Sequence, residues 1–451
     1  MKRDDLLKRV KEDEVEIVAL QFTDILGTTK SVSIPTGRLP EALDRGIWFD
    51  GSSIEGFARI YESDMVLRPD RRTYSVLPWT PSGARTARII CDIHRPDGSP
   101  FPGDPRYVLR RMMERAASMG VVYNAGPELE FFLFKKNADD KPRRMDFPLR
   151  PVPHDVGGYF DFSPLDLASA VQAEIMRYAS SLGMHAESAH HEVAMAQHEI
   201  DIEYADALTS ADNVITLRYT IRAVAAAHGL YATFMPKPIQ GENGSGMHVH
   251  QSLFDREGKS AFFDADDRYR LSPAAYRFIA GQLAHARAFA AVVAPTVNSY
   301  KRLTPGYEAP VYVCWGRVNR SALIRVPSYS PGREQSTRAE LRCPDPSANP
   351  YLAFAVMLAA GLDGIEKEMN APEPVEEDVY DLDDAALSRS GIQSLPMTLG
   401  GALRALAGDD VIREALGEHV YDAFTRAKTA EWEEYRNYVT GWELERYLEK
   451  L

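Results

Sequence analysis

Two histidines follow a glycine-rich loop in the stretch from Lys237 to Leu253, KPIQGENGSGMHVHQSL. If Met247 to Leu253 is a strand, its side chains alternate between two faces, so His248, His250 and Ser252 share one of them. The glycines before this strand let the backbone approach a ligand closely. The pattern predicts a polar cleft, although two histidines on one strand also occur as a hydrogen-bonded surface pair, since histidine has both roles.

Carboxylates with the same alternation occur elsewhere in the chain. Glu128 and Glu130 stand two residues apart in GPELEFFLF, where the intervening apolar residues indicate a strand with its other face buried. Two such carboxylates repel each other unless a cation is bound, so we expect that removing the charge of Glu128 relieves repulsion. The segments HHEVAMAQHEIDIE and RAELR add Glu192, Glu199 and Glu340. Because carboxylates dominate, with His248 as nitrogen donor, the set predicts Mg²⁺ or Mn²⁺ rather than zinc.

Arginines are the third group with a clear chemical meaning. A guanidinium binds carboxylate or phosphate oxygens through two parallel hydrogen bonds, so arginines that converge on metal ligands indicate phosphoryl transfer. A single arginine of this kind, considered alone, is better explained as the partner in a surface ion pair than as a phosphate ligand. The sequence lacks a Walker A loop, because the stretch 257–260 has no first glycine and predicts a hairpin turn. The candidate arginines are Arg302, Arg320, Arg325, Arg338 and Arg342.

Elements that position these residues follow from capping and periodicity. Val15 to Phe22 and Lys30 to Ile34 predict an antiparallel pair in a small β domain that ends near Pro102. After it, capping residues and helical spacing predict helices that alternate with short strands. With 451 residues, a second and larger domain is expected. The predicted helices run from Asp104 to Gly120, Ser163 to Gly183, Asp212 to Gly229 and Ser272 to Pro295.

Composition excludes several classes of protein. The net charge of -13 argues against a nucleic-acid or anionic-membrane partner, which would require a basic face. Only 3 cysteines are present, so neither a disulfide framework nor a cysteine zinc site is expected. No apolar run is long enough for a membrane span, and the charged N-terminus lacks a secretory signal. These features predict a cytoplasmic protein.

Seven motifs, in one order along the chain, are similar to those of class I glutamine synthetase. They are DGSSIEG at Asp50, GPELEFF at Gly126, HHEVA at His190, NGSGMHVHQSL at Asn243, KRLTPGYEAPV at Lys301, NRSALIR at Asn319 and RAELRCPDPSANPYL at Arg338. The resemblance implies an α+β fold. A small N-terminal β-grasp-like domain would span residues 1–102, and a large catalytic domain with an antiparallel sheet flanked by helices would span residues 103–451.

The same resemblance implies a reaction and its metal sites. ATP would phosphorylate the side-chain carboxylate of glutamate, and ammonia would displace the phosphate from this γ-glutamyl phosphate to give glutamine. Two Mg²⁺ or Mn²⁺ ions would assist, one next to substrate and one next to the nucleotide phosphates. The implied ligands are Glu130, Glu192 and Glu199 for the first ion, and Glu128, His248 and Glu340 for the second.

Substrate contacts are likewise implied by matching motif positions. Arg320 and Arg325 would stabilise the transferred phosphoryl group, and Asp50 with Asp64 would bind ammonium and take up its proton. Glu308 would lie on a loop that closes over the intermediate. The remaining matches are glutamate contacts at Asn243, Gly244, His248, Arg302 and Arg342, and nucleotide contacts at His250, Ser252 and Arg338.

Assembly and regulation are also implied by the family. The N-terminal domain of one subunit would complete the active site of its neighbour in a dodecamer of two six-membered rings, so Asp50 would act in trans. Arg59 matches a position through which the alpha subtype senses glutamine as a feedback inhibitor. Tyr380 superficially resembles a tyrosine that another subtype adenylylates, but Gly391 to Pro396 favours the alpha subtype.

One departure and three alternatives accompany the resemblance. Met195 and Ala196 stand where Pro-Gly is usual, so the backbone between Glu192 and Glu199 could turn differently. A related ligase of larger amines would lack the acidic pair Asp50 and Asp64. A non-enzymatic scaffold would lack metal ligands, and a zinc hydrolase would depend on the two histidines of the glycine-rich segment.

Overall fold

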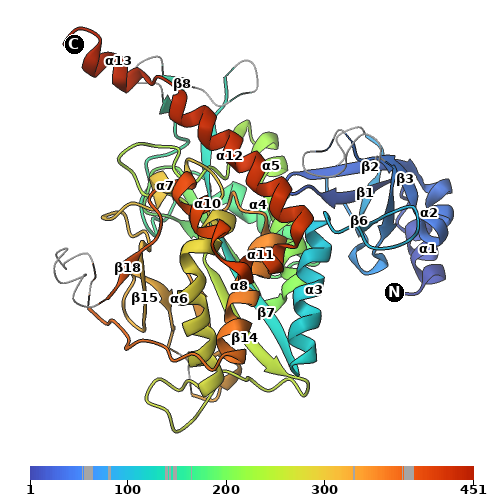
Figure 1. Ribbon diagram of the computed structural model, residues 1–451. Helices are drawn as coiled ribbons and strands as arrows, with labels where there is room; N and C mark the ends of the chain where they lie inside the picture. Colours follow the sequence, from blue (N-terminus) through green and yellow to red (C-terminus); the bar gives the residue numbers. More distant parts are fainter. Residues whose placement is uncertain are drawn as a thin grey trace.

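The computed structural model describes residues 1–52, 54, 64–79, 83–137, 141, 144–145, 150–163, 165–328, 331–377, 379 and 391–451. A small N-terminal domain lies beside a larger body, from which the C-terminal helix projects (Figure 1). Among the described residues, no helix combines the length and the apolar character that a membrane span requires.

The N-terminal domain is a 6-stranded sheet with two helices. Its elements are α1 (Arg3–Glu12), β1 (Ile17–Thr23), β2 (Thr29–Pro35), α2 (Leu39–Arg45), β3 (Ile47–Asp50), β4 (Asp64–Pro69), β5 (Ser75–Val76) and β6 (Thr86–His94). The predicted hairpin is confirmed: β1 and β2 are antiparallel, with Leu20 opposite Val32. β6 pairs in parallel with β1 and antiparallel with β4, which in turn pairs with β3.

The larger domain is built on a 10-stranded sheet whose central order is β10-β11-β7-β14-β17-β16-β15-β18. The strands are β7 (Val121–Lys135), β10 (Ala186–His191), β11 (Gln197–Ile202), β12 (Ala205–Asp206), β13 (Leu230–Thr233), β14 (Val249–Asp255), β15 (Tyr312–Gly316), β16 (Ala322–Arg325), β17 (Ala339–Leu341) and β18 (Gln393–Ser394). A separate pair joins β8 (Arg144–Met145) to β9 (Arg150–Pro151).

This sheet is mixed rather than purely antiparallel, because β15 and β16 run parallel. The loop between them is held by the segment 375–377: Asn319 donates hydrogen bonds to the carbonyls of Val375 and Glu377, and the Glu376 carboxylate accepts from the Arg317 amide. These bonds join the short loop between β15 and β16 to the segment 375–377. The expected antiparallel sheet is therefore correct for the other pairs of the sheet and wrong for this one.

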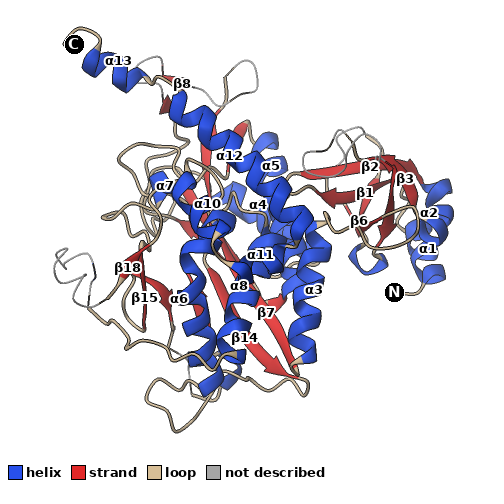
Figure 2. Ribbon diagram, in the orientation of Figure 1, coloured by secondary structure: helices blue, strands red, loops and turns tan. Residues whose placement is uncertain are grey.

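Helices α6, α8 and α3 lie side by side over β7 and β14 (Figure 2). Two predicted starts are wrong. The second predicted helix begins at Ser169, after a turn in which Asp166 accepts from the Ala168 amide, and the third begins at Ala207, because Asp206 caps the Thr209 amide. The helices are α3 (Pro105–Ser118), α4 (Ser169–Ser181), α5 (Ala207–Ala227), α6 (Pro273–Val293), α7 (Ser299–Arg302), α8 (Pro350–Glu366), α10 (Leu399–Ala407), α11 (Asp410–Leu416), α12 (Glu418–Asn437) and α13 (Gly441–Tyr447).

Glycine residues permit helices α6 and α8 to cross closely where they cover the sheet. A Cβ atom at Gly281 would lie 2.1 Å from the Ala360 carbonyl oxygen and 2.7 Å from the Gly364 amide nitrogen. Any larger residue would push the two helices apart, and they carry much of the buried core.

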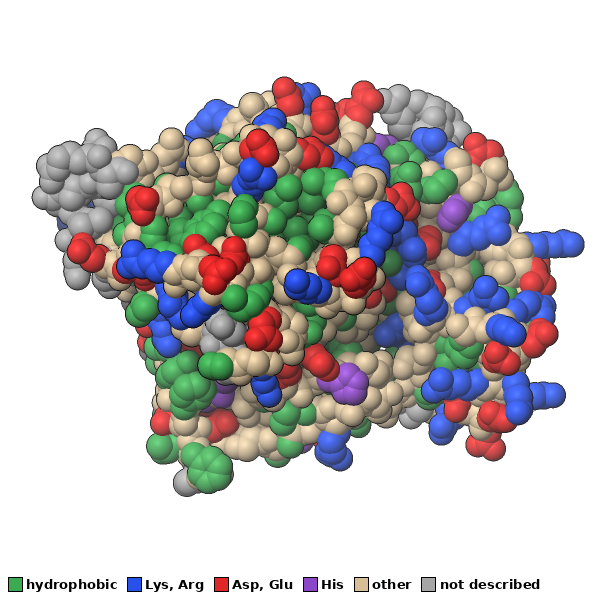
Figure 3. All heavy atoms as spheres, turned by 90° about the horizontal axis from the view of Figure 1, so that it is seen from below, with side chains coloured by type: hydrophobic (Ala, Val, Ile, Leu, Met, Phe, Trp, Pro, Cys, Tyr) green, Lys and Arg blue, Asp and Glu red, His purple; other side chains and the backbone are tan. Residues whose placement is uncertain are grey.

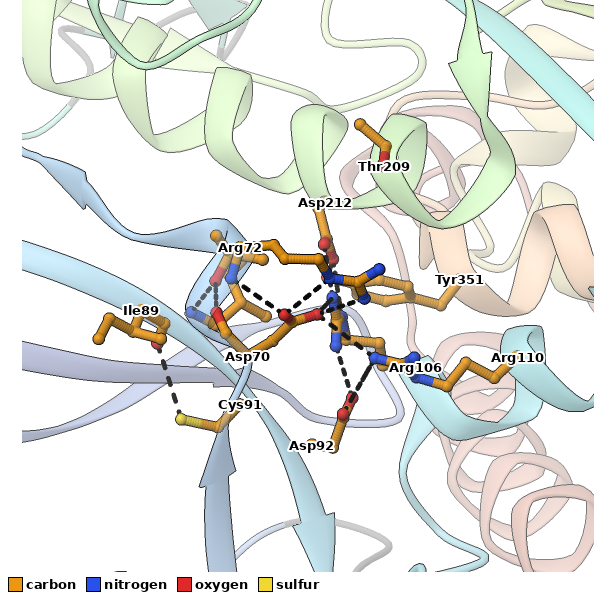
Figure 4. Close-up of polar contacts among 12 residues, drawn as sticks. Asp70, Arg72, Ile89, Cys91, Asp92, Arg106, Arg110, Thr209, Asp212 and Tyr351 are labelled. Carbon is orange, nitrogen blue, oxygen red and sulfur yellow. Dashed lines mark hydrogen bonds and ion pairs between the residues drawn. The ribbon is translucent and has the colours of Figure 1, made fainter. Parts of the chain in front are cut away.

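A buried ionic cluster joins the two domains (Figure 4). Arg106 at the start of α3 donates to both carboxylate oxygens of Asp212 on α5, at 3.0 and 2.8 Å, and to Asp70, at 3.0 Å, and Asp92 of the N-terminal domain. The Tyr351 hydroxyl adds a hydrogen bond of 2.7 Å to Asp212. Burial would raise the pKa of Asp70, but bonds from Arg72 and the charge of Arg106 hold it well below its usual value. The orientation of the domains is therefore fixed by paired charges.

Candidate active site

A cavity of about 640 Å³ lies at the edge of β7 and β11 and collects most of the predicted site residues. Its wall also includes segments far away in the sequence, among them the Gly-rich loop before β14 and the loop that contains Glu308. The predicted residues that line it are Glu128, Glu130, Glu192, Glu199, Asn243, Gly244, His248, Arg302, Glu308, Arg320, Arg325, Glu340 and Arg342.

Strand register brings the carboxylates together. In the antiparallel pair β7–β11, Glu130 lies directly opposite Glu199, and Glu128 lies opposite Asp201. Side chains at directly opposite positions are close neighbours on one face of a sheet, and like charges there are destabilising. The predicted shared face of Glu128 and Glu130 thus becomes one side of a cluster of four carboxylates.

The crowding of carboxylates raises the pKa values of Glu130 and Glu199. Burial and the charges of Glu199 and Glu192 raise the pKa of Glu130 well above its ordinary value. Burial and the charge of Glu128 raise the pKa of Glu199 to about 10, and burial raises that of Glu192. A bound cation would reverse the cause of these shifts, because it favours the ionised carboxylates.

Glu128 behaves differently, since two histidines form hydrogen bonds with its carboxylate. The His248 Nδ1 and His250 Nε2 atoms lie 3.0 and 2.6 Å from its carboxylate oxygens. Burial alone would raise the pKa of Glu128, but these hydrogen bonds hold it well below the usual range. The expectation that removing this charge relieves repulsion stays a prediction: the charge of Glu128 raises the pKa of Glu199, but removing it also weakens the two histidine hydrogen bonds.

Hydrogen bonds also fix the states of the two histidines. The Arg338 Nε–H donates to His250 Nδ1 at 3.0 Å, so His250 carries its proton on Nε2 and donates it to Glu128. Burial and the nearby Arg342 lower the pKa of His248 to about 4. A neutral His248 that donates from Nδ1 to Glu128 keeps a lone pair on Nε2, which is the form that binds a metal ion.

Glu340 anchors two of the arginines. Its carboxylate is fully buried and accepts from Arg342 Nη1 at 2.6 Å and from Arg325 Nε. Burial would raise the pKa of Glu340, but the positive charge of Arg342 lowers it. The pair of arginines is therefore held in place at the cavity wall, with N–H groups that remain for a ligand.

The Gly-rich loop has no room for side chains where it passes this cluster. A Cβ atom at Gly246 would lie 2.6 Å from Arg302 Nη2 and 3.0 Å from Glu130 Oε1. Arg302 itself donates to the carbonyls of Arg342 and Cys343, at 3.0 and 2.9 Å, so its guanidinium braces the backbone as well as lining the cavity.

Glu308 has an uncommon backbone conformation. Its φ angle is 54°, in the left-handed region that costs a residue with a side chain roughly 1–2 kcal/mol. The preceding Tyr307 packs against Lys237, whose Nζ lies 3.8 Å from the ring centroid. Strained residues cluster at functional sites, and this one lines the cavity.

The donor set fits divalent metal ions, although it does not separate into the two implied triads. Among the described residues, four groups place their donor atoms within 4.8 Å of one another. Three include carboxylates of this cavity: Glu128 with Glu199 and His248, Glu128 with His250 and Glu340, and Glu192 and Glu199 with His190. The fourth, Asp155 with His191 and His198, is buried and does not line the cavity. Glu130 is in none of these groups, and its Oε2 accepts from Gln197 at 2.7 Å. Mainly oxygen donors, crowded and buried, suit Mg²⁺ or Mn²⁺.

Several predicted residues lie elsewhere. Asp50 and Asp64 are on the N-terminal domain and do not line this cavity. His250 and Arg338 lie behind Glu128, and Ser252 is buried farther along β14. The predicted regulatory position Arg59 and the alternative Tyr380 lie outside the described residues.

Several polar residues of the cavity wall were not predicted: Tyr159, Ser188, His190, Gln197, Asp201 and Tyr307. Gln197 donates to Glu130, His190 Nε2 lies 3.0 Å from Glu199 Oε1, and Tyr159 lines the cavity. His190 and Gln197 are immediate neighbours of predicted segments, so their position on β10 and β11 was a usable signal. Tyr159 comes from an irregular loop, where periodicity gives no indication of direction.

Comparisons with known families agree over the whole chain. A family model described as the glutamine synthetase catalytic domain matches residues 102–447, and one described as the glutamine synthetase β-grasp domain matches residues 14–96. A glutamine synthetase of Halobacterium salinarum is 52% identical over 447 residues, which cover 99% of this chain and 96% of that protein. One of Thermus thermophilus is 51% identical over 449 residues, with 98% of each chain covered.

Solved structures show the same fold. A glutamine synthetase of Plasmodium falciparum superposes with a TM-score of 0.88 at 26% identity, covering 99% of both chains. A structure titled as a GmaS/ADP complex superposes with a TM-score of 0.87 at 34% identity, again over 99% of both chains.

Proposed function

This chain belongs to the glutamine synthetase family, and from the geometry of its cavity we propose how its residues divide the work of the reaction. The enzyme makes glutamine from glutamate and ammonia with ATP, as its relatives of about half identical sequence do. The observation that carries the residue assignment is the convergence of crowded carboxylates and anchored arginines on one cavity. In such a site, the arginines on one side and cations held by the carboxylates on the other would neutralise phosphate charge.

Phosphoryl transfer is the first step. The side-chain carboxylate of glutamate attacks the γ-phosphorus of ATP, the bond to the bridging oxygen breaks, and ADP leaves. Arg325, held by Glu340, and Arg320, at the open edge, would donate to the phosphoryl oxygens as charge moves onto the leaving group. The pair Arg338–His250 would support the nucleotide side, and the related GmaS structure titled as an ADP complex favours nucleotide binding in this fold.

Two divalent ions, Mg²⁺ or Mn²⁺, are proposed for the carboxylate cluster. Glu130, Glu192 and Glu199 would hold one, and Glu128, His248 and Glu340 the other. Bound there, the ions would supply positive charge that polarises the γ-phosphoryl group and offsets the negative charge of both substrates. The raised pKa values of Glu130 and Glu199 and the free lone pair on His248 Nε2 support this assignment.

Glutamate would lie between the Gly-rich loop and the buried arginines. Arg342 and Arg302 would bind its main-chain carboxylate, and the small residues Asn243 and Gly244 would let it approach the loop. Glu308 would then close over the γ-glutamyl phosphate, which water would otherwise hydrolyse. Ammonia attacks the activated carbonyl carbon, the bond to the phosphate oxygen breaks, and inorganic phosphate leaves.

The ammonium site would be completed by a second subunit. Asp50 and Asp64 are exposed on the N-terminal domain and do not line the cavity of their own chain. Apolar side chains on the surface support assembly: Figure 3 shows them gathered near the middle of one face, with charged residues of both signs around them. Helix α13, elsewhere on the molecule, also has exposed aromatic residues, Trp442 and Tyr447. We propose a homo-oligomer, most simply a dodecamer of two six-membered rings.

A ligase of larger amines is the main alternative within this fold, and the acidic pair Asp50 and Asp64 favours ammonium. The experiment is an assay of phosphate release that requires ATP, glutamate and an amine, run with ammonium and with methylamine or putrescine. A higher kcat/KM for ammonium is expected. A preference for either amine would transfer the assignment to the alternative.

The proposal also includes a mode of regulation and a cellular location. We propose that glutamine inhibits the enzyme by feedback through Arg59, and that Tyr380 is not a site of adenylylation. The fixed positive charge of Arg59 would hold a neighbouring acidic side chain or the active-site loop in its glutamine-bound arrangement. Glutamine inhibition of Arg59→Ala that equals that of the wild type would exclude this role. A cytoplasmic location is supported by cysteines that are all unpaired.

A further inference from the structure

A second large cavity, of about 710 Å³, lies where the N-terminal domain meets the catalytic domain. The β1–β2 turn around Thr28 forms one wall, and helix α5 forms another through Arg218, Tyr219 and Arg222. None of the catalytic or metal-binding residues assigned above lines this cavity. It is therefore a different site.

Arg218 is a buried cation that lacks an ion-pair partner among the described residues. Only 7% of the residue is exposed. Its Nη2 donates to the Ala348 carbonyl at 2.6 Å, whereas its Nε is buried without any hydrogen-bond partner. Burial and the neighbouring Arg222 lower the pKa of Arg218 to about 9, and the partly compensating Asp345 bonds to Ser347 instead. A buried charge in this state is costly unless a ligand pairs with it.

Two further groups on the same helix point to a missing anion. Tyr219 has a buried hydroxyl without a partner. Arg222, which is exposed to solvent, also lines the cavity; it lies over the Phe234 ring, 5.0 Å from its centroid, and no described carboxylate pairs with it. The acidic residue in the wall, Glu431, already accepts from Lys428 and from the Val297 amide. The cavity therefore has an excess of unpaired donors and positive charge.

The rest of the wall is suited to an apolar body. Leu26, Phe234, Met235, Pro236, Val297 and Pro346 contribute apolar surface. A mostly apolar pocket with a few convergent donors is the usual form of a small-molecule site. We propose that this cavity binds a small organic anion, with one carboxylate or phosphate group on an apolar body, and that its occupancy modulates the active site.

The coupling follows from two segments that the cavities share. Asn298 lines the new cavity, and its side chain bonds to the Lys237 amide and carbonyl at 2.7 and 3.1 Å, just before the Gly-rich loop. The next element, α7, ends at Arg302 of the active site. Pro236, also in the wall, accepts from Ser245 of that loop. A ligand that shifts either segment acts on residues that border glutamate.

Thiol protection tests occupancy in the full-length enzyme. The three native cysteines are buried, so Met235→Cys introduces a single accessible thiol in the cavity wall, at a position that is 43% exposed. Its alkylation by iodoacetamide is timed with benzoate, phenyl phosphate and the neutral benzyl alcohol. At least one anion should slow labelling saturably, by about tenfold at ten times its Kd, and the alcohol should not. Benzoate and phenyl phosphate distinguish a carboxylate site from a phosphate site.

Matched variants keep the test specific. Met397→Cys, at a position that is 83% exposed and outside the cavity, should label equally with and without the anions. Arg222→Gln should weaken protection roughly tenfold, whereas Arg222→Lys should retain it because the charge remains. Protection by neither anion, equal protection by benzyl alcohol, or protection unchanged in Arg222→Gln would overturn the site.

Kinetics test the second half of the proposal. The protecting anion should change the KM for glutamate in the wild type and not in Arg222→Gln, whose basal activity should be unchanged. An anion that protects the thiol but leaves kcat and KM unaltered would overturn the coupling. An anion that inhibits both proteins equally acts at the active site and would also count against it.

Discussion

Asp50 and Asp64 lie directly opposite each other across the β3–β4 ladder, and both side chains are exposed. Like charges at opposite positions destabilise a sheet, so the pair is arranged to attract a cation. Hydrogen bonds from the side chain and backbone of Ser52 lower the pKa of Asp50, which keeps it ionised. These features support the proposal that the pair binds ammonium at a site completed by a second subunit.

We expect Asp50→Ala to lower glutamine formation by roughly 100-fold or more, as loss of a general base does, while ATP and glutamate binding change little. Steady-state kinetics and calorimetry measure both. Asp97→Ala is the matched control, because Asp97 is exposed and accepts from the Ser99 amide at 2.8 Å, as Asp50 does from the Ser52 amide at 2.8 Å. Equal losses in catalysis and in substrate binding would remove Asp50 from ammonium chemistry.

Mixed assembly tests whether this residue acts in trans. Subunits carrying Asp50→Ala, co-assembled with subunits carrying Glu308→Ala, should recover part of the activity at interfaces that contain neither lesion. If mixed oligomers form and stay inactive, the site lies within one chain.

Substitutions of two neighbouring glutamates, compared with each other, test the proposed metal-binding carboxylates. Glu130→Gln should weaken Mn²⁺ binding roughly tenfold or more and stabilise the metal-free protein by about 1 kcal/mol, because it relieves repulsion with Glu199. Glu128→Gln should also weaken binding but should destabilise the metal-free protein, because the ionised Glu128 accepts hydrogen bonds from two histidines. Titration calorimetry and chemical unfolding give the two quantities. The same stability change in both variants would contradict the charge assignment.

Ala196, in the turn between β10 and β11, has a φ angle of 60°. This conformation costs an alanine roughly 1 kcal/mol and a glycine almost nothing. Ala196→Gly should therefore raise the free energy of unfolding by about 0.5–1 kcal/mol. Ala194→Gly, in the same turn without a positive φ angle, should lower it. Opposite signs in a urea titration are the expected result, and equal destabilisation by both would show that Ala196 is unstrained.

His285 predicts a pH dependence of stability. Its Nδ1 and Nε2 lie 2.6 and 3.0 Å from the carboxylates of Asp409 and Asp363. Burial alone would lower the pKa of His285, but these two bonds raise it. The stabilisation is complete below the unfolded value near 6.5 and is lost as pH rises through the folded pKa, at about 1.4 kcal/mol for each pH unit between the two.

Unfolding measured between pH 6 and pH 9 should show a smaller decrease for His285→Gln than for the wild type. His228→Gln is the control, because exposed His228 bonds to one carboxylate, that of Glu174. A pH profile that His285→Gln leaves unaltered would assign the dependence to other groups.

Substitution of Arg106 should cause a large loss of stability. It is 3% exposed and bonds to three carboxylates from both domains. Arg106→Gln leaves these buried charges unpaired and should cost about 3–5 kcal/mol. Arg72→Gln, at the more exposed edge of the same cluster, should cost about 1 kcal/mol or less. Thermal unfolding compares the two, and similar small losses would mean that the cluster does not hold the domains together.

The sequence alone determined the family, through motif order, and much of the local geometry. The alternation that predicted a shared face for His248 and His250 is confirmed by their contacts with the same carboxylate of Glu128. Capping residues placed the starts of α3 and α6 correctly, because a cap needs only its own next few residues. Period and capping are local properties, so they can be read along the chain.

Tertiary structure decided what depends on pairing between distant segments. The position of Glu130 opposite Glu199 is set by the β7–β11 register, and a one-residue slip would have turned one of them to the other face. The same dependence explains why Glu128 accepts hydrogen bonds from two histidines and Glu130 from a glutamine. Arg218 and Arg222 read as ordinary helix residues, and only the packing of α5 against the N-terminal domain leaves them unpaired around a cavity. Burial and charge pairing depend on contacts between segments that are distant in the sequence, so no local sequence pattern predicts them.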